Sequence, residues 1–201
     1  MPDSIGPEKG CIVVLPIGKV PESALDAVSD SISLYFNHHT RILSPLRTPQ
    51  CAFDEQRRQY NAATIIRTLE SINFEDDAKV VAIVNVDLFI PIFTHVMGEA
   101  QEGGKFALVS MYRLMKGGMG NRPSTSKILK RLAKVALHEL GHLFDVVHCA
   151  DEKCIMHFAG NIQDIDHIML NFCTYCERYL EESMKRHLKP TSLCSHHPEL
   201  T

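Results

Sequence analysis

The chain has 201 residues, of which 45% are hydrophobic and 22% are charged, and its formal net charge is −3. These values are typical of one globular domain and exclude a disordered or low-complexity chain. A small negative charge without a dense lysine or arginine run gives no general attraction for nucleic acid or for an anionic membrane surface.

The chain begins with MPDSIGPEKG, which has an acidic residue and a proline where a secretory signal would carry positive charge. No apolar run approaches the roughly 20 residues that are needed to cross a bilayer. We therefore expect a cytoplasmic protein without membrane or nucleic-acid partners. In such a reducing compartment, a cluster of four of the seven cysteines favours metal binding over disulfides.

The first two-thirds of the chain alternate apolar runs of strand length with stretches of helical period, which indicates a layered α/β domain. In chain order, we expect a strand at 11–17, a helix at 23–36, a strand at 40–43, a helix at 55–72, a buried strand at 79–88, a short edge strand and turn within 93–104, and a strand at 105–112.

A loop at 116–123 breaks this pattern, and Ser124 or Thr125 can cap a long, largely buried helix that continues to about Phe144. A C-terminal helix is expected over 165–180. We predict a single domain at 1–188, with an upper subdomain at 1–145, a lower subdomain at 146–188 and a flexible tail at 189–201.

The long helix carries the motif His138-Glu139-Leu140-Gly141-His142. Two histidines four residues apart point the same way from successive helical turns, so that one zinc ion can bind both. Glu139 lies about 100° round the helix, where it can reach a water molecule on the metal. His148 supplies a third ligand if the chain turns back after the helix, which leaves the open position that a catalytic zinc needs.

A chance match and a structural metal site are the two alternatives to a catalytic zinc at this motif. HExxH occurs by chance on exposed helix faces, although the third histidine at this offset favours a zinc site. A purely structural zinc site is less consistent with three histidines, because such sites close all four positions; Asp145 or His157 would then be the fourth ligand.

The clustered cysteines form two close pairs, Cys149 with Cys154 and Cys173 with Cys176. This spacing predicts a structural four-cysteine zinc site, and the alternative is a set of buried free thiols. A closed site would tether the loop after His148 to the C-terminal helix.

Together these residues resemble the metzincin clan of metallopeptidases, whose zinc motif HExxHxxGxxH is followed by a turn that contains a methionine. The four cysteines around Met156 are similar to those of the archaemetzincin family in particular. The resemblance implies a metzincin-like α/β fold, with a twisted mixed sheet, packed helices, a long active-site helix and a smaller C-terminal subdomain. It also implies that Met156 lies beneath the three histidines as an apolar floor.

One residue departs from the family pattern, because Asp145 stands where the motif has glycine. The glycine allows a positive φ at the helix end, and aspartate tolerates this conformation better than most residues. We therefore still expect the turn to form.

The predicted function is hydrolysis of peptide bonds by a metal-activated water, with Glu139 as general base and then general acid, and with two Zn²⁺ ions per chain, one catalytic and one structural. The substrate is expected to lie extended along an edge strand within 93–112. The alternative function is a zinc-stabilised peptide-binding or regulatory module with little or no hydrolytic activity, and the presence of Glu139 argues against it.

Overall fold

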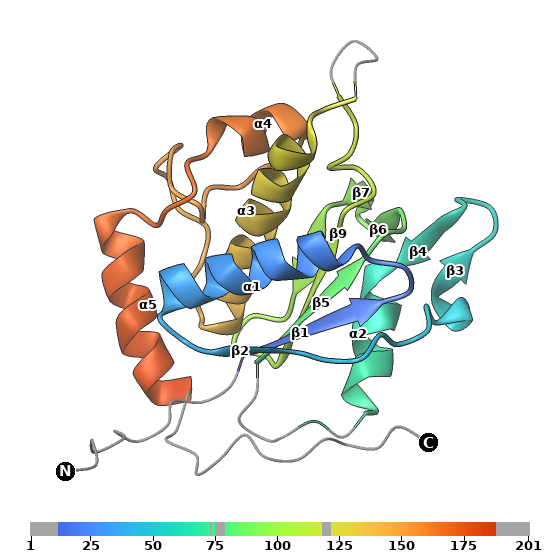
Figure 1. Cartoon of the computed structure of the whole chain (residues 1–201), viewed down its shortest axis with the longest axis horizontal. Helices are drawn as coiled ribbons and strands as arrows, with labels where there is room; N and C mark the ends of the chain where they lie inside the picture. Colours follow the sequence, from blue (N-terminus) through green and yellow to red (C-terminus); the bar gives the residue numbers. More distant parts are fainter. Residues whose placement is uncertain (1–11, 73, 75–78, 118–121, 188–201) are drawn as a thin grey trace.

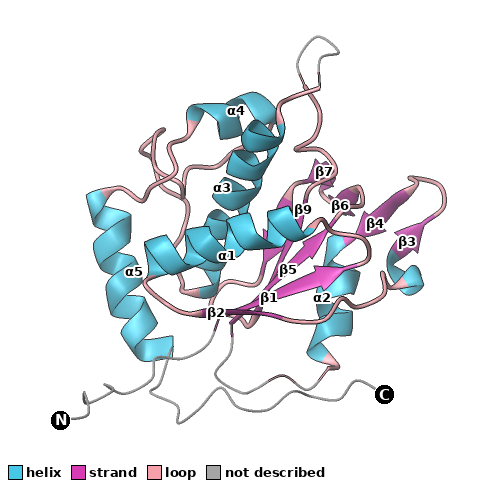
Figure 2. Cartoon of the chain, viewed as in Figure 1, coloured by secondary structure: helices cyan, strands magenta, loops and turns pink. Residues whose placement is uncertain are grey.

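The computed structural model describes residues 12–72, 74, 79–117 and 122–187. Its elements are mixed α and β, as Figure 2 shows, and the α/β prediction is confirmed. In chain order they are β1 (Ile12–Ile17), α1 (Glu22–Phe36), β2 (Thr40–Ile42), the 3-10 helix η1 (Gln50–Ala52), β3 (Phe53–Asp54), β4 (Gln59–Asn61), α2 (Ala62–Glu70), β5 (Lys79–Val84), β6 (Leu88–Ile90), β7 (Phe93–Val96), β8 (Gly98–Ala100), β9 (Phe106–Ser110), α3 (Thr125–Leu143), α4 (Ile162–His167) and α5 (Thr174–His187).

Two sheets form the framework. The first has the order β2-β1-β5-β9-β8, in which β8 runs antiparallel to its neighbour and the other pairs are parallel. The second has the order β3-β4-β6-β7. Within the described chain β8 pairs only with β9, so that β8 is an edge strand of the first sheet.

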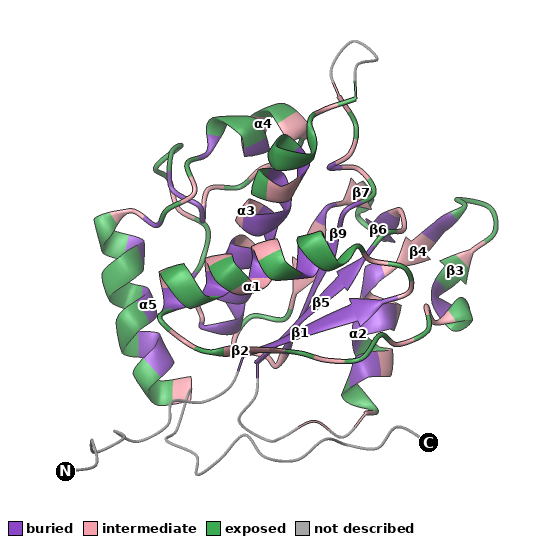
Figure 3. Cartoon of the chain, in the orientation of Figure 1, coloured by how far each residue is buried: buried purple, intermediate pink, exposed green. Residues whose placement is uncertain are grey.

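The central strands are buried on both faces, and alternate residues therefore enter two different cores. On one face, Val14 and Val81 pack with helices α1 and α3. On the other face, Val13 and Val80 pack with α2. The helices cover the sheet from both sides (Figure 1). In Figure 3 the strands between them are buried, whereas the outer faces of the helices are exposed.

Helix α3 begins and ends on recognisable signals. The Ser124 side chain accepts a hydrogen bond from the backbone N–H of Lys127, which confirms Ser124 as the N-cap. At the other end, Asp145 takes the left-handed conformation with φ 61°. The backbone N–H groups of Asp145 and Val146 return to the carbonyl oxygens of His142 and Gly141, which closes the helix as a Schellman motif. The chain therefore turns back after α3, as predicted.

The helix predicted at 55–72 was wrong in its first part. The structure has the strand pair β3 and β4 there, with Arg58 at φ 53° in the turn, and α2 begins only after Asn61. Asn61 caps α2 by accepting a hydrogen bond from Thr64, and an N-cap residue does not continue a helix on its N-terminal side. The strand predicted at 79–88 likewise ends at Val84, and β6 begins at Leu88.

The single helix predicted at 165–180 is divided into α4 and α5. Between them the chain pairs with the loop after α3, since the carbonyl oxygen of Asn171 accepts a hydrogen bond from Ile155, and Met169 donates to Lys153. A continuous helix would have used these backbone groups internally.

The predicted boundary between subdomains at residues 145 and 146 stays a prediction, and the tail predicted at 189–201 lies outside the described residues. Among the described residues, no helix is both long and apolar enough to cross a membrane. The expected cytoplasmic location stays a prediction.

Candidate metal centres and cleft

The three histidines of the sequence motif come together at the C-terminal half of α3. Their ligand nitrogens lie within 4.8 Å of one another, and Nε2 of His138 lies 3.1 Å from Nε2 of His142. Two imidazoles that share a tetrahedral zinc ion at about 2.05 Å have nitrogens about 3.3 Å apart. The spacing therefore suits one metal ion.

Hydrogen bonds orient the two helical imidazoles. Nδ1 of His138 lies 2.8 Å from the carbonyl oxygen of Ile155, and Nδ1 of His142 lies 2.8 Å from that of Val146. Because a carbonyl oxygen only accepts, Nδ1 carries the proton in each ring and Nε2 is left with a lone pair. Burial is also the main cause that lowers the pKa of His138, to about 3, so that this ring is neutral. Neutral imidazole nitrogens of this kind are ligands that suit zinc.

The third histidine and the methionine lie on the returning chain. His148 is exposed, and its ring centroid lies 5.2 Å from that of His138 and 4.9 Å from that of His142. Met156 is fully buried, and a Cβ added at Gly141 would lie 2.6 Å from its sulfur. The glycine inside the motif thus leaves room for Met156 against the helix beside the histidines, consistent with the expected floor.

Glu139 is buried, with 8% of its surface exposed, and its side chain packs directly against Gly98 of the edge strand β8. No described residue forms a hydrogen bond or an ion pair with its carboxylate. Burial, and then the negative charge of Glu99, raise the pKa of the Glu139 carboxyl to about 8. An acid-base group with an affinity for protons near neutrality therefore lies beside the histidine cluster.

Both features open into one cleft of about 460 Å³, a size suited to a few amino-acid residues. The three histidines and Glu139 line it, together with strands β7 and β8. Ile155 and the segment from Phe158 to Gly160 line it as well, with Ile165 of α4 and Ile168 just after that helix. The cleft thus borders the edge of β8 that pairs with no described strand, where an extended chain can add as a further strand.

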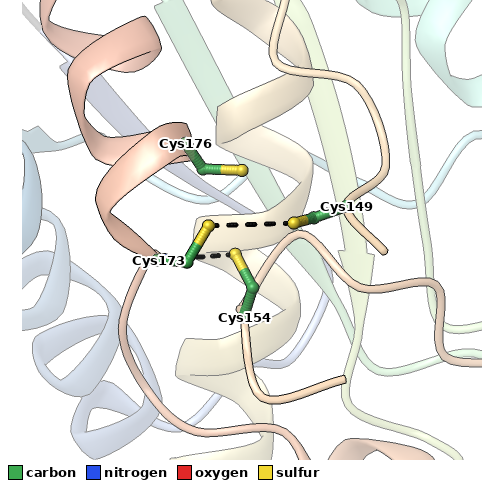
Figure 4. A group of neighbouring side chains, drawn as sticks. All are labelled: Cys149, Cys154, Cys173 and Cys176. Atoms are coloured by element: carbon green, nitrogen blue, oxygen red, sulfur yellow. Dashed lines mark hydrogen bonds between the residues drawn. The ribbon is translucent and has the colours of Figure 1, made fainter. Parts of the chain in front are cut away.

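The four clustered cysteines also converge. Figure 4 shows Cys149 and Cys154 on the loop after α3, facing Cys173 and Cys176 at the start of α5. Their sulfur atoms lie within 4.8 Å of one another, and the sulfurs of Cys149 and Cys173 are 3.8 Å apart. Sulfurs that share a tetrahedral zinc ion at about 2.3 Å are also about 3.8 Å apart.

The surroundings of the cysteines suit thiolate ligands held by a cation. The sulfur of Cys154 accepts a hydrogen bond from the backbone N–H of Cys173, and that of Cys149 accepts one from Asp151. Burial raises the pKa of Cys154 to about 11 and also raises that of Cys176, so that charged thiolates need a positive partner here. All four are free cysteines, and so is the exposed Cys51. Cys11 and Cys194 lie outside the described residues.

Three contacts at the site were not predicted from the sequence. Gly98 makes room for Glu139, Lys134 lines the cleft one helical turn before His138, and Asp145 is hydrogen-bonded to α5. Lys134 and His138 are four residues apart on one helix face, a spacing that could have identified the lysine. The other two contacts join distant segments and leave no local signal.

Comparison with known proteins agrees with this geometry. A model of peptidase family M54 matches residues 27–182. The archaemetzincin of Pyrococcus abyssi is 35% identical over 183 residues, which cover 88% of this chain and 97% of that protein. The crystal structure of archaemetzincin from Methanopyrus kandleri superposes with a TM-score of 0.79 at 29% identity and covers 90% of this chain and 98% of that one. A zinc-dependent peptidase from Methanocorpusculum labreanum gives a TM-score of 0.76 at 25% identity, with 84% of this chain and 99% of that one covered.

The fold and the site thus define a class of protein, the zinc metallopeptidases. The family model spans most of the chain, and the relatives match over nearly their whole length. This chain belongs to the archaemetzincins, peptidase family M54.

Proposed function

We propose that the chain hydrolyses peptide bonds at a zinc ion held by His138, His142 and His148, with Glu139 as general base and general acid. The observation that carries the proposal is a buried carboxylate without a described partner, beside three imidazoles whose ligand nitrogens converge. The hydrogen bonds at Nδ1 leave Nε2 of His138 and of His142 free to bind the metal.

The protein residues have distinct roles in this mechanism. When bound, zinc supplies a Lewis acid that polarises the substrate carbonyl and acidifies water. Glu139 takes the proton from the attacking water and delivers it to the leaving amine. Burial raises the pKa of the Glu139 carboxyl and so makes it a stronger base toward that water. Gly98 has no side chain, and the Glu139 carboxylate occupies the space in which a Cβ at this position would lie.

The substrate backbone pairs with the free edge of β8. Gly98, Glu99 and Ala100 border the cleft, and the strand is hydrogen-bonded to β9 on its other side. A peptide added antiparallel to this edge passes over the histidines. This places a carbonyl group within reach of both the metal and Glu139.

We further propose that Cys149, Cys154, Cys173 and Cys176 hold a second, structural zinc ion. Four thiolates close all coordination positions and leave none for a substrate. The ion would join the loop between His148 and Met156 to α5, which holds the third histidine in place.

The test measures zinc content and peptide turnover in the same preparations. Wild type should hold two zinc ions per chain and cleave a mixed library of fluorogenic peptides. The Glu139→Gln variant should keep both ions and lose turnover by at least about a hundredfold. The His142→Ala variant should hold one ion and have no turnover.

Each contrary result points to a different error. An active Glu139→Gln protein would exclude the carboxylate as general base. Two zinc ions without turnover in wild type would favour the peptide-binding module. One zinc ion in wild type would show that one of the two clusters is not a metal site.

A further inference from the structure

Three cations on α3 face the segment around α4, and their partners differ. Arg131 donates two hydrogen bonds of 2.7 Å to the two carboxylate oxygens of Asp166, and Lys127 lies 2.8 Å from the same group. Lys134 has no carboxylate within ion-pair distance among the described residues. Its ammonium group donates one 2.7 Å hydrogen bond to the carbonyl oxygen of Ile165.

This unpaired ammonium lines the cleft. Lys134 is half-buried, and the cleft wall around it includes Val135, Ile165 and Ile168, which are all buried. Burial is the largest cause of the lowered pKa of Lys134, ahead of the opposing charge of Asp166. A cation at an apolar wall with one neutral acceptor has lost part of its hydration without gaining a counter-ion. A ligand carboxylate would supply both the charge and the missing acceptors.

The acidic side chains of the cleft act on the histidines and Glu139 and not on Lys134. Glu99 on β8 and Glu102 just after it line the cleft near the histidines, whereas Lys134 lies beyond His138. A peptide through the cleft therefore meets negative charge near His142 and His148 and positive charge at Lys134. Carboxylates are repelled from the first and attracted to the second.

We propose that Lys134 determines specificity by binding a substrate carboxylate near the scissile bond. The inference rests on the proposed function, because the scissile bond lies at the histidines. One helical turn separates Lys134 from His138, about 6 Å along the axis, and an extended peptide advances about 3.3 Å per residue. The carboxylate thus belongs to a residue within two positions of the scissile bond. It comes from an Asp or Glu side chain or from the C-terminus of a short substrate.

The experiment measures binding separately from turnover. Peptides that differ only by Glu or Gln at one position, each with a free or an amidated C-terminus, are titrated into zinc-loaded Glu139→Gln protein by fluorescence anisotropy. The same pairs are cleaved by wild type, and product masses locate the scissile bond. We expect the Glu peptide, the free C-terminus, or both to bind at least about tenfold more tightly than its neutral counterpart.

Variants at position 134 test whether Lys134 causes this preference for a carboxylate. In the Glu139→Gln background, Lys134→Met should reduce it to less than about twofold, Lys134→Arg should keep it, and Lys134→Glu should reverse it in favour of the Gln peptide. Lys130→Met is the matched control, because Lys130 is exposed on the same helix and is not part of the cleft wall. Zinc content and melting temperature establish that each variant is folded.

The outcomes separate the two proposals. Loss of the preference in Lys134→Met but not in Lys130→Met supports carboxylate binding by Lys134. A wild type that cleaves no peptide overturns the proposed hydrolysis and, with it, the place of Lys134 beside a scissile bond. Equal affinity for charged and neutral peptides, an unchanged preference in Lys134→Met, or no binding of any peptide overturns carboxylate binding by Lys134. Of these, the first two leave the proposed hydrolysis intact when wild type cleaves both peptides of a pair.

Discussion

The carboxylate of Asp145 accepts a 2.6 Å hydrogen bond from Nε2 of His187, at the end of α5. Asp145 lies midway between His142 and His148, in the left-handed turn that directs the chain back after α3. The hydroxyl of Ser183 also lies 3.4 Å from this carboxylate, and the hydrogen bond from His187 holds the pKa of Asp145 below its usual value. Asp145, which stands where the metzincin motif has glycine, therefore connects the segment that leads to His148 with α5.

A substitution at position 145 can change the free energy of unfolding in two ways, by removing the hydrogen bonds to α5 and by changing the strain of the positive φ. Asp145→Gly removes the hydrogen bonds but relieves a positive φ, and we expect a loss of about 1 kcal/mol in the free energy of unfolding. Asp145→Val removes the same bonds and places a β-branched residue at φ 61°, which should cost about 3 kcal/mol. Urea unfolding of the zinc-loaded proteins measures both. Equal losses for the two variants would show that the positive φ at position 145 adds no cost for a β-branched side chain.

The contact between Gly98 and Glu139 predicts a loss of activity without a loss of metal. Gly98→Ala places a methyl group where the carboxylate lies, so that Glu139 must move. We expect kcat/KM for peptides to fall at least about a hundredfold while both zinc ions remain. Gly160→Ala is the control on the other wall of the cleft, since its Cβ would make an ordinary 3.6 Å contact with Phe158 and should change the rate little. Similar rates for the two variants would contradict the assigned position of Glu139.

The cysteine cluster predicts a change in stability that is specific to one zinc ion. Cys173→Ser should lower the zinc content from two ions to one and weaken the junction between the loop after α3 and α5. We expect the melting temperature to fall by roughly 5 °C or more, which corresponds to a few kcal/mol for a domain of this size. Cys51→Ser should leave both quantities unchanged, because Cys51 is exposed and far from the cluster in sequence. An unchanged zinc content in Cys173→Ser would exclude the cluster as a metal site.

The sequence predictions were correct where the signal lies within a few residues of the chain, and they failed where the structure depends on distant segments. The spacing of His138 and His142 is set by one helix, and the cap at Ser124 is set within four residues, so that both were predicted correctly. The segment 55–72 has helical periodicity, but its first part forms the turn at Arg58 and strand β4, and α2 begins only after Asn61. Local periodicity could not show that strand β4 would find β6 as a partner.

The tertiary contacts of the site were what the sequence did not predict. Gly98 matters because β8 meets α3, and Asp145 because α5 returns to the end of the same helix. Neither contact has a fixed sequence spacing. The assignment of roles to the histidines, Glu139 and the cysteines stays a proposal that the zinc and turnover measurements decide.

The ion pair between Arg131 and Asp166 predicts an acid-dependent stability difference. Arg131 is 3% exposed, and its hydrogen bonds are the largest cause that lowers the pKa of Asp166 from 3.8 to about 2. A carboxyl with a lowered folded-state pKa contributes stability above its unfolded value near 3.8, and this contribution is lost as the pH falls through about 2. After allowance for solvent screening of a side chain that is 29% exposed, we expect Asp166→Asn to cost about 1 kcal/mol at pH 6.

The difference between wild type and Asp166→Asn should shrink between pH 4 and pH 2.5, because protonated aspartate and asparagine are both neutral. Urea unfolding at pH 6, 4 and 2.5 measures it, and loss of zinc at low pH affects both proteins alike. Asp26→Asn serves as the control, since Asp26 is exposed on α1 and forms no ion pair with a described residue. A penalty for Asp166→Asn that stays constant with pH would show that Arg131 is held by hydrogen bonding alone, and that the charge of Asp166 contributes nothing to the free energy of unfolding.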